Sequence, residues 1–396
     1  MFVRLLFVKE ALAWPRSSGH DVHCYNMMRA TAGMGHEIAL ATVQRPLDDA
    51  VRGLPLGRYD CLGEPGPDDG LNPAPRYTKL QEKFRSYWGI DPGRVSGVGR
   101  AARDWKADVV VVVGLNVLPY LGAVESAKRV WYAADEWVWH HLSLFRPFQP
   151  STWGNLREAA AKGLYERAYG PLLDRIWLVT EADRRAMRLV AGTAALDVLP
   201  NGVDADHFAP VDRPQAERSC TFWGRLDFGP NVQGLEWFCR RVWPAVRKAA
   251  PDARFTVYGF RPTDAVRALT GRDGIELVPD LPDLRNEVAG HAAVVLPFVS
   301  GGGIKNKLLE AAAMGKAIVC SPRACGGLRL EGTPPLRIAR SPAAWVRDLL
   351  ALWEDAPKRA ALGAAARRWV MEHHTWEAAA RTALAGLSEA DGGQAQ

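Results

Sequence analysis

The residues with the clearest chemical potential lie together between Ala292 and Cys320. An apolar run, Ala292–Pro297, leads into three consecutive glycines, Gly301–Gly303, and then directly into a helical pattern. Glycines at such a junction let backbone N–H groups approach a ligand closely. The first turn of the helix adds free N–H donors and the positive end of its dipole. This arrangement favours binding of a phosphate group.

Charged side chains in the same segment are suited to a nucleotide. Lys305 and Lys307 add positive charge, and Glu310, one turn into the helix, offers a carboxylate that can accept two hydrogen bonds from a sugar diol. Phosphate on one side and ribose on the other indicate a nucleotide or nucleotide-sugar. The open alternative is a plain strand–loop–helix whose glycines serve only the turn, although three in a row cost backbone entropy.

Length and composition limit the class of protein. A chain of 396 residues is long enough for two domains, and 48% hydrophobic with 24% charged residues is typical of a globular protein. The net charge of +6 is modest and spread over both halves. It argues against a dedicated nucleic-acid partner, but it suits anionic small substrates or weak contact with an acidic membrane surface.

Cysteine spacing and apolar runs predict the compartment. The six cysteines form no Cys-x-x-Cys pair and no metal-ligand spacing, which favours reduced thiols. Met1–Val8 reads as a strand followed by charged residues, not as a signal peptide. The longest apolar run, Val109–Val124, is too short and too interrupted to span a membrane. We expect a soluble cytoplasmic protein, with peripheral contact at the inner membrane face left open.

Strands and helices alternate along the first half of the chain. Five consecutive valines in Asp108–Val113 are typical of a strand buried on both faces of a sheet. Residues 46–75, rich in Gly, Pro and Asp, are expected to be loops with little regular structure. The strands predicted here are Val3–Val8, Glu37–Val43, Asp108–Val113, Arg129–Tyr132, Arg175–Val179 and Leu196–Leu199.

A second series of strands begins after residue 214. Its predicted members are Cys220–Trp223, Arg254–Tyr258, Ile275–Val278, Ala293–Leu296 and Ala317–Val319. Repeated strand–helix units indicate an α/β protein with two Rossmann-like domains, 1–205 and 206–372, facing a central cleft. An Ala- and Arg-rich helical tail, interrupted near His373–Trp376, is expected to return to the first domain over residues 373–396.

Four segments, in this order, resemble motifs of the retaining glycosyltransferases of family 4, which have the two-domain GT-B fold. They are Leu199–Asp204 with Phe208–Pro210, Phe222–Leu226, Glu310–Lys316, and Ala366–Arg367 with Thr375–Glu377. The resemblance implies transfer of a sugar from a nucleoside-diphosphate sugar to an acceptor hydroxyl, with retention of configuration. A helix N-terminus together with Arg225 and the lysines can neutralise the departing diphosphate, so neither a metal nor another cofactor is predicted. A glycan, a lipid-linked compound and a small molecule all remain open as acceptors.

The resemblance also implies where the donor binds. It assigns the ribose to Glu310, the diphosphate to Arg225, and further phosphate contacts to the backbone of Gly302–Asn306. The base is expected near the backbone of Val278–Leu281. The predicted substrate-binding residues are Gly19, Arg225, Leu281, Gly302, Gly303, Ile304, Lys305, Asn306, Lys307 and Glu310.

Two departures from the family pattern concern the donor site. Gly302 replaces a glutamate that often precedes Glu310 by eight residues, as in a family branch with a Gly-rich loop. A lysine expected soon after Arg225 is also missing. Lys305 or Lys307 can supply its charge, but residues two apart on a regular helix point in different directions. Lys307 can instead pair with Glu310 at i,i+3.

Two predictions concern the first domain. Gly19 follows the first strand and loosely matches a family loop near the donor phosphate, although a tight turn explains it equally well. Asp135 follows the strand Val130–Ala133, where a carboxylate beside a cleft can assist deprotonation of the acceptor. Capping of a helix at Trp137–Leu144 is the alternative for Asp135. The many aromatic residues of 131–153 suit sugar stacking or ordinary core packing.

Other classes of protein fit the residues less well. The Asp-x-Asp pattern Asp204–Asp206 falls in the linker between the domains, so no metal site is predicted. A nicotinamide oxidoreductase should carry Gly-x-Gly-x-x-Gly after an early strand, and Lys9–Gly19 does not. A nucleotide-sugar epimerase or hydrolase on the same fold, and a non-catalytic nucleotide-sugar-binding protein, remain the alternatives.

Overall fold

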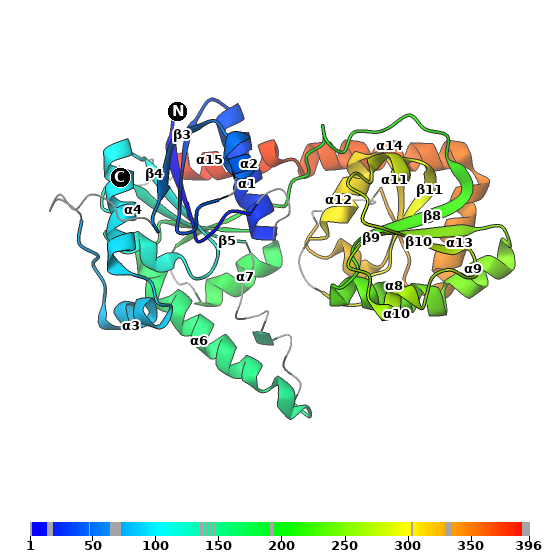
Figure 1. The fold of residues 1–396 in the computed structure, drawn as a ribbon, viewed down its shortest axis with the longest axis horizontal. Helices are drawn as coiled ribbons and strands as arrows, with labels where there is room; N and C mark the ends of the chain where they lie inside the picture. Colours follow the sequence, from blue (N-terminus) through cyan, green and yellow to red (C-terminus); the bar gives the residue numbers. More distant parts are fainter. Residues whose placement is uncertain are drawn as a thin grey trace. The chain divides into compact units, whose positions relative to one another are not determined.

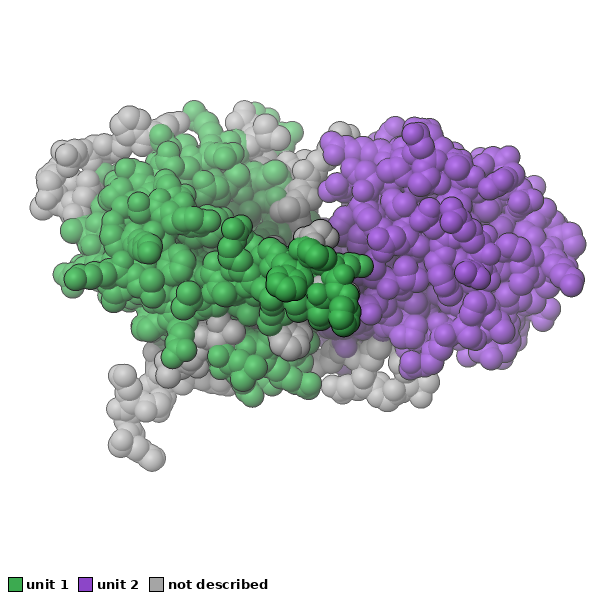
Figure 2. Space-filling view, turned by 90° about the horizontal axis from the view of Figure 1, so that it is seen from below, with its two compact units in different colours: residues 1–199, 379–396 green, residues 200–378 purple. Residues whose placement is uncertain are grey.

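The chain forms two compact units, which are coloured separately in Figure 2. Unit 1 comprises residues 1–199 and 379–396, and unit 2 comprises residues 200–378. The computed structural model describes residues 2–13, 19–46, 48–63, 73–134, 138, 141–142, 145, 147–190, 194–301, 304–328 and 335–389. Each unit is a parallel sheet with helices on both faces, as Figure 1 shows. The predicted class of two parallel α/β domains is confirmed.

Unit 1 is built on a seven-stranded sheet in the order β3-β2-β1-β4-β5-β6-β7. Strand β4 contributes apolar side chains to both faces of this sheet, since its five valines are all buried. That pattern requires cover on both sides of the sheet. The strands are β1 (Arg4–Lys9), β2 (Glu37–Thr42), β3 (Leu56–Cys61), β4 (Val109–Val113), β5 (Lys128–Ala134), β6 (Arg175–Leu178) and β7 (Ala195–Val198).

Two helices of unit 1, α3 and α4, begin at side-chain caps. Thr78 and Gln81 form a reciprocal capping box at the start of α3, and Asp91 caps α4 with a proline in its first turn. The helices are α1 (Gly19–Gly33), α2 (Asp48–Arg52), α3 (Lys79–Tyr87), α4 (Pro92–Trp105), α6 (Gly154–Tyr169) and α7 (Glu181–Val190), with the 3₁₀ segments η1 (Leu118–Ala123), η2 (Pro150–Thr152) and η3 (Gly170–Leu172).

The expectation of little regular structure in residues 46–75 is wrong in part. This region contains α2 and the edge strand β3, which pairs in parallel with β2. Five of the six residues of β3 are only partly buried and one is exposed, so the strand lacks the apolar run by which buried strands are recognised. Its position depends on pairing with β2 more than on its own composition.

Unit 2 contains a six-stranded sheet in the order β10-β9-β8-β11-β12-β13. Its strands are β8 (Ala216–Arg225), β9 (Arg254–Phe260), β10 (Ile275–Pro279), β11 (His291–Leu296), β12 (Ala317–Cys320) and β13 (Arg337–Ile338). Helices α8 (Gly229–Arg241) and α10 (Asp264–Arg267) cover one face, and α12 (Asn306–Ala313) and α14 (Ala356–His373) cover the other (Figure 1). The remaining helices are α9 (Trp243–Ala249), α11 (Arg285–Ala289), α13 (Pro342–Glu354) and the 3₁₀ segment η4 (Pro322–Cys325).

Both sheets share one strand order. In each unit the second and third strands add to one side of the first strand, and the fourth and later strands add to the other side. The chain therefore reverses its direction of growth between β1 and β4, and again between β8 and β11. In parallel α/β sheets, ligands bind at such a reversal, outside the carboxyl ends of the strands.

The helical tail is interrupted where the sequence predicts. Helix α14 ends at His373, α15 spans Trp376–Glu389, and Thr375 between them forms a parallel bridge with Val203. From residue 379 the chain belongs to unit 1, where Lys128 Nζ donates to the Leu387 carbonyl at 2.8 Å. No helix in the described part of the chain is both long and apolar enough to cross a membrane.

A close approach between α12 and α14 in unit 2 gives a test of this packing. A Cβ atom added to Gly363 of α14 would lie 1.9 Å from the Gly315 carbonyl oxygen, which is backbone and cannot rotate away. We therefore expect Gly363→Ala to lower the free energy of unfolding by about 1–3 kcal/mol, as overpacking does, although alanine favours helix. Urea denaturation measures this.

Gly33→Ala is the matched control, because Gly33 ends α1 with no other atom within 4 Å of an added Cβ. This control should be neutral or slightly stabilising. Equal stability changes in the two variants would show that the α12–α14 contact is looser than described.

Candidate functional site

The candidate site lies at the carboxyl ends of β8 and β11, where the strand order of unit 2 reverses. Four segments meet there: the end of β8, the first turn of α8, the loop after β11, and the first turn of α12. The loop after β11 is held to the sheet by Ser321, whose hydroxyl donates to the Phe298 carbonyl at 2.7 Å. Sheet geometry thus brings together residues up to 109 positions apart, from Asn201 to Glu310.

Lys307 is the central cation of the site. Its Nζ donates to Asn231 Oδ1 at 3.0 Å and lies 5.0 Å from the ring centroid of Phe222 and 5.2 Å from that of Phe298. Burial lowers the pKa of Lys307 to about 8, the negative charge of Glu310 opposes this shift, and Lys305 adds to it. An ammonium carries three donors. Within the described residues one hydrogen bond is formed, so the others can serve an anion.

Gly224 makes room for this ammonium. Its φ is +141°, and an added Cβ would lie 2.8 Å from Lys307 Nζ and 3.1 Å from Asn231 Nδ2. Asn231 Nδ2 in turn donates to the Arg225 carbonyl at 2.7 Å, so the amide is held by the backbone at the end of β8. Any side chain at position 224 would both strain the backbone and displace the lysine.

Glu310 lies one turn further along α12. Trp223 Nε1 donates to Glu310 Oε2 at 2.9 Å. Burial raises the pKa of Glu310, while the hydrogen bond from Trp223 and the charge of Lys307 act in the opposite direction. A carboxylate has about four acceptor positions, so one indole donor leaves capacity for two hydroxyl groups. The direct Lys307–Glu310 ion pair that the sequence left open is not formed in the described structure, although each of the two charges acts on the pKa of the other group.

Both lysines lie near the same aromatic ring, although residues two apart on a regular helix are expected to point in different directions. Lys305 Nζ lies 5.4 Å from the centroid of the Phe298 ring, the same ring that Lys307 contacts. The expectation assumed a regular helix. Lys305 is instead the N-cap of α12, with extended φ −91° and ψ 99°, so helical spacing does not apply to it. Two cationic groups thus lie beside the first turn of one helix.

Asn306 and Ile304 have supporting positions. Asn306 begins α12, and its Oδ1 accepts from Asn201 Nδ2 at 2.7 Å. The Asn201 carbonyl oxygen lies 3.1 Å from His374 Nδ1, which ties the start of α12 to the chain around residue 201. Ile304 packs against the hydrophobic core of unit 2. These contacts position the start of α12.

Arg225 has a partner that the sequence analysis did not consider. Its guanidinium donates to both oxygens of Asp227, from Nε at 3.0 Å and from Nη2 at 3.2 Å. The hydrogen bonds from Arg225 hold the pKa of Asp227 below its usual value. The Arg225 side chain is 53% exposed, and exposed ion pairs contribute little to stability. Contact with phosphate therefore requires only a weak pair to open, and this role of Arg225 stays a prediction.

The other predicted residues are dispersed. Gly19 begins α1 in unit 1, and Leu281 is partly buried against the core of unit 2. Asp135, Gly302 and Gly303 lie outside the described residues. No cluster of three or more potential metal-binding side chains occurs in the described part of the chain.

Sequence reasoning missed five residues of the site: Phe222, Trp223, Gly224, Asn231 and Phe298. Three of them end the strand β8, and their position next to Arg225 was available as a signal. Asn231 lies soon after Arg225, in the segment where the family pattern has a lysine that this chain lacks. Its amide oxygen instead holds Lys307, which comes from a different helix and supplies the charge.

Comparison with known proteins bears on unit 2 most directly. Residues 217–355 match the family described as Glycosyl transferases group 1. The D-inositol 3-phosphate glycosyltransferase of Kineococcus radiotolerans is 27% identical over 285 residues, 61% of this chain and 65% of that protein. An uncharacterized 44.6 kDa protein of the cps region of Klebsiella pneumoniae is 32% identical over 98 residues, 23% of this chain and 25% of its own. The chain thus matches less than two thirds of the length of either relative.

Solved structures share the fold over nearly the whole chain. S. aureus TarM superposes with a TM-score of 0.70 at 11% identity, covering 97% of this chain and 98% of TarM. HepE of Anabaena in complex with UDP gives a TM-score of 0.65 at 12% identity, covering 98% and 100%. Sucrose-phosphate synthase of Thermosynechococcus elongatus gives 0.65 at 14%, covering 98% and 99%. These likenesses establish the GT-B fold, and the family match supports a glycosyltransferase.

The low pKa of Lys307 predicts a pH-dependent contribution to stability. In the unfolded chain lysine releases its proton near its ordinary pKa of 10.5, but in the folded protein near 8. Between these pH values the unfolded state binds more protons, so the contribution of Lys307 to the unfolding free energy rises with pH. The rise should approach about 1.4 kcal/mol per pH unit at most.

Urea denaturation of the wild type and Lys307→Met at pH 7.5, 8.5 and 9.5 measures this. Burial of Cys24 raises its pKa to about 12, so the contribution of this thiol to the unfolding free energy falls as the pH rises. Both proteins share this effect, and the informative quantity is therefore the difference between their unfolding free energies at each pH. Lys83→Met, on an exposed part of α3, is the control and should give a constant difference. A constant difference for Lys307→Met as well would contradict the low pKa.

Proposed function

We propose that this protein transfers a sugar from a nucleoside-diphosphate sugar to an acceptor hydroxyl, with retention of anomeric configuration. The observation that carries the proposal is the buried Lys307 ammonium, which lies beside Lys305 at the start of α12 with Glu310 one turn away. The ammonium groups suit a diphosphate, and the carboxylate can accept hydrogen bonds from a ribose diol. HepE, which shares the fold, is described in complex with UDP and with UDP-glucose.

Electrostatic stabilisation of the leaving diphosphate is the proposed source of catalysis. As the bond between the sugar and the diphosphate breaks, negative charge grows on the phosphate oxygens. Two ammonium groups and the N-terminal dipole of an eight-residue helix are already oriented there. Fixed charges in a partly desolvated site need little reorganisation and stabilise such a transition state strongly. We infer that the lysines perform the charge neutralisation that a divalent metal performs in other transferases.

Glu310 is proposed to select the donor through its ribose. The Trp223 indole fixes one carboxylate oxygen, so the orientation of the group is set before the ligand binds. Burial disfavours the charged form of Glu310. Hydrogen bonds from a ribose diol would take the place of water around this carboxylate. Retention of configuration rests on the motif resemblance, and Asp135 remains the proposed group for acceptor deprotonation.

A surface of unit 1 supports a lipid-linked acceptor. The outward face of α6 and the residue before it carry apolar side chains that are well exposed: Trp153 at 56%, Leu156 at 39% and Leu164 at 56%. Arg157 and Arg167 are exposed on the same face. Arg157 lies four residues after Trp153, and Arg167 lies three residues after Leu164. Exposed apolar groups interleaved with cations match the interface of an anionic bilayer. Along this helix Glu166 is buried, and Glu158 lies to one side, 3.8 Å from Arg157.

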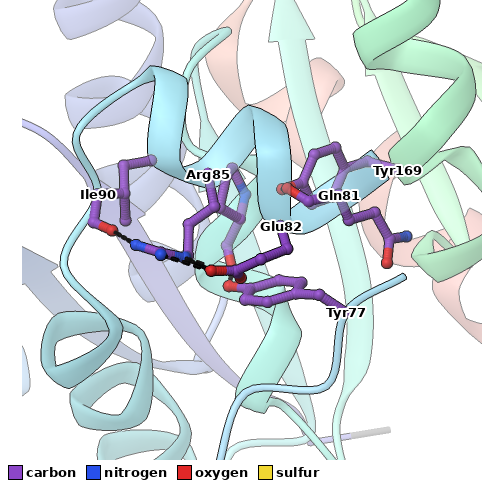
Figure 3. Close-up of polar contacts among 7 residues, drawn as sticks. Tyr77, Gln81, Glu82, Arg85, Ile90 and Tyr169 are labelled. Carbon is purple, nitrogen blue, oxygen red and sulfur yellow. Dashed lines mark hydrogen bonds and ion pairs between the residues drawn. The ribbon is translucent and has the colours of Figure 1, made fainter. Parts of the chain in front are cut away.

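Helix α3 packs beside α6 and repeats the pattern with Leu80, Lys83 and Tyr87, of which Tyr87 is 75% exposed. Polar contacts hold α3 in place, as Figure 3 shows. Arg85 lies between the Glu82 carboxylate and the Ile90 carbonyl, which accepts a hydrogen bond from it. The Gln81 side chain donates to the Ala168 carbonyl of α6 at 2.8 Å. We propose that this α3–α6 surface contacts an anionic membrane where a lipid-linked acceptor resides.

The first test addresses Glu310. We expect Glu310→Gln to lose the charge-assisted hydrogen bonds to the ribose, worth about 1.5–3 kcal/mol each. Affinity for the best binder among UDP, GDP, ADP and TDP should fall roughly tenfold to more than a hundredfold. Calorimetry measures this. An unchanged affinity, with the fold intact by circular dichroism, would refute the placement of the nucleotide.

Glu236→Gln is the matched control, because Glu236 is a partly exposed glutamate of α8 that pairs only weakly with Arg240, at 3.5 Å. It should bind like the wild type. Incubation of the wild type with a bound nucleotide-sugar and no acceptor separates the classes of enzyme, because an epimerase would release an epimer under these conditions.

The second test addresses the α3–α6 surface. Binding to phosphatidylglycerol vesicles should weaken about tenfold or more in the double variant Arg157→Glu/Arg167→Glu, since each basic residue near an anionic surface contributes about 1 kcal/mol. Trp153→Ala should also reduce binding, through lost apolar burial. Leu189→Ala, which removes an 86% exposed leucine from α7, is the control and should have no effect. Equal binding of the wild type to phosphatidylcholine vesicles would contradict an electrostatic membrane contact.

A further inference from the structure

Two cysteines lie in contact beside the loop that carries the candidate site. Cys320 ends β12 and is fully buried, while Cys325 ends η4 and is partly exposed. Their Sγ atoms are 3.4 Å apart. A disulfide bond has a length of about 2.0 Å, so a shift of only about 1.4 Å would join them. The two cysteines are five positions apart in the sequence, and η4 is a short segment that can absorb such a shift.

We propose that Cys320 and Cys325 are a reversible oxidation site, at which a hydroperoxide forms a disulfide that weakens binding of the nucleotide. The first part concerns the chemistry of the two thiols alone. The second part rests on the proposed function, because it assumes that the nucleotide binds at Lys305, Lys307 and Glu310.

Exposure and charge make Cys325 the thiol that reacts first. The hydrogen bond from Cys320 and the charge of Arg340 lower the pKa of Cys325, against the opposing effect of burial. The same hydrogen bond and burial raise the pKa of Cys320. The thiolate is the nucleophile in thiol chemistry. A partly exposed thiolate backed by a buried thiol is the arrangement of a reactive and a resolving cysteine.

The reaction balances with hydroperoxide as the oxidant. The Cys325 thiolate attacks the terminal oxygen of the hydroperoxide, the O–O bond breaks, and the departing alkoxide or hydroxide takes a proton. Cys325 is then a sulfenic acid. Cys320 loses its proton and attacks this sulfur, so that hydroxide leaves and becomes water. Two thiols have given up two electrons and two protons in total, and a dithiol reductant reverses the change by exchange.

Ser321 connects this pair to the phosphate-binding lysines. It directly follows Cys320, and its hydroxyl donates to the Phe298 carbonyl at 2.7 Å while accepting from the Ala324 N–H at 3.2 Å. Closing the disulfide draws the end of η4 toward β12 and must move the Ala324 N–H, which lies between the two cysteines. The Phe298 ring, on which Lys305 and Lys307 both rest, is two hydrogen bonds away.

Other thiols are less suited to this chemistry. Cys24, Cys220 and Cys239 are buried, and burial raises the pKa of each of them, so their thiolates are scarce at neutral pH. Cys61 is also partly exposed, and its Sγ contacts the Val43 carbonyl at 3.9 Å in place of another thiol. It can be oxidised, but it has no resolving partner in that contact, which makes it a useful control.

The experiment treats the full chain with hydrogen peroxide, removes the excess with catalase, blocks remaining thiols and identifies linked peptides by mass spectrometry. We expect a Cys320–Cys325 link that dithiothreitol reverses. Calorimetry with UDP should show affinity about tenfold lower in the oxidised protein and restored after reduction. Cys325→Ser should form no link and keep its affinity under peroxide, whereas Cys61→Ser should respond like the wild type.

Two results would overturn the proposal: oxidised wild type without a Cys320–Cys325 link, or the link with unchanged UDP affinity. Its failure is distinguishable from failure of the proposed function. If the reduced protein binds no nucleoside diphosphate, the donor assignment fails and with it the coupling, while the mass spectrum still decides whether the thiol pair is an oxidation site.

Discussion

Desolvation of one positive charge is the constraint on which the candidate site depends. The Lys307 ammonium lies beside two aromatic rings, and burial lowers its pKa to about 8. The neighbouring segments must therefore approach the ammonium closely, which requires residues without a side chain at the points of contact. Gly224 provides this at the end of β8, and Gly234 lets α8 approach the loop after β11, because an added Cβ there would lie 2.9 Å from the Pro297 carbonyl oxygen. Asn231 is carried into position by that helix.

A second lysine in unit 2 shows what distinguishes a site from a structural contact. Burial also lowers the pKa of Lys316 to about 8, so burial disfavours the charged forms of Lys316 and Lys307 to a similar degree. Lys316 Nζ, however, donates to two backbone carbonyls, those of Ala289 at 2.9 Å and His291 at 2.5 Å. Its charge stabilises the chain at the start of β11. Within the described residues, Lys307 donates one hydrogen bond, to the Asn231 amide oxygen, and otherwise lies beside two aromatic rings.

The sequence predicted the elements better than the contacts between them. The valines of β4 indicate burial, and the glycines before α12 indicate a tight turn of the backbone. Both properties can be recognised within a short stretch of sequence. β3 was missed because an edge strand needs little apolar surface. The shared position of Lys305 and Lys307 beside the Phe298 ring was missed because it depends on the extended backbone of one residue, the N-cap of α12. Pairing of Trp223 with Glu310 depends on the order of strands, which no single segment records.

The same strand order in unit 1 produces a different electrostatic result. At the corresponding reversal, Lys9 ends β1 and its Nζ lies 2.9 Å from the carboxylate of Asp21 in the first turn of α1. Both side chains are nearly buried, with 11% and 8% exposed, so this cation is already neutralised within the protein. A buried pair gains little from a further anion and loses much if one partner is drawn away. Within the described residues Lys307 of unit 2 forms no ion pair with a carboxylate, which supports the proposal that the diphosphate binds at unit 2.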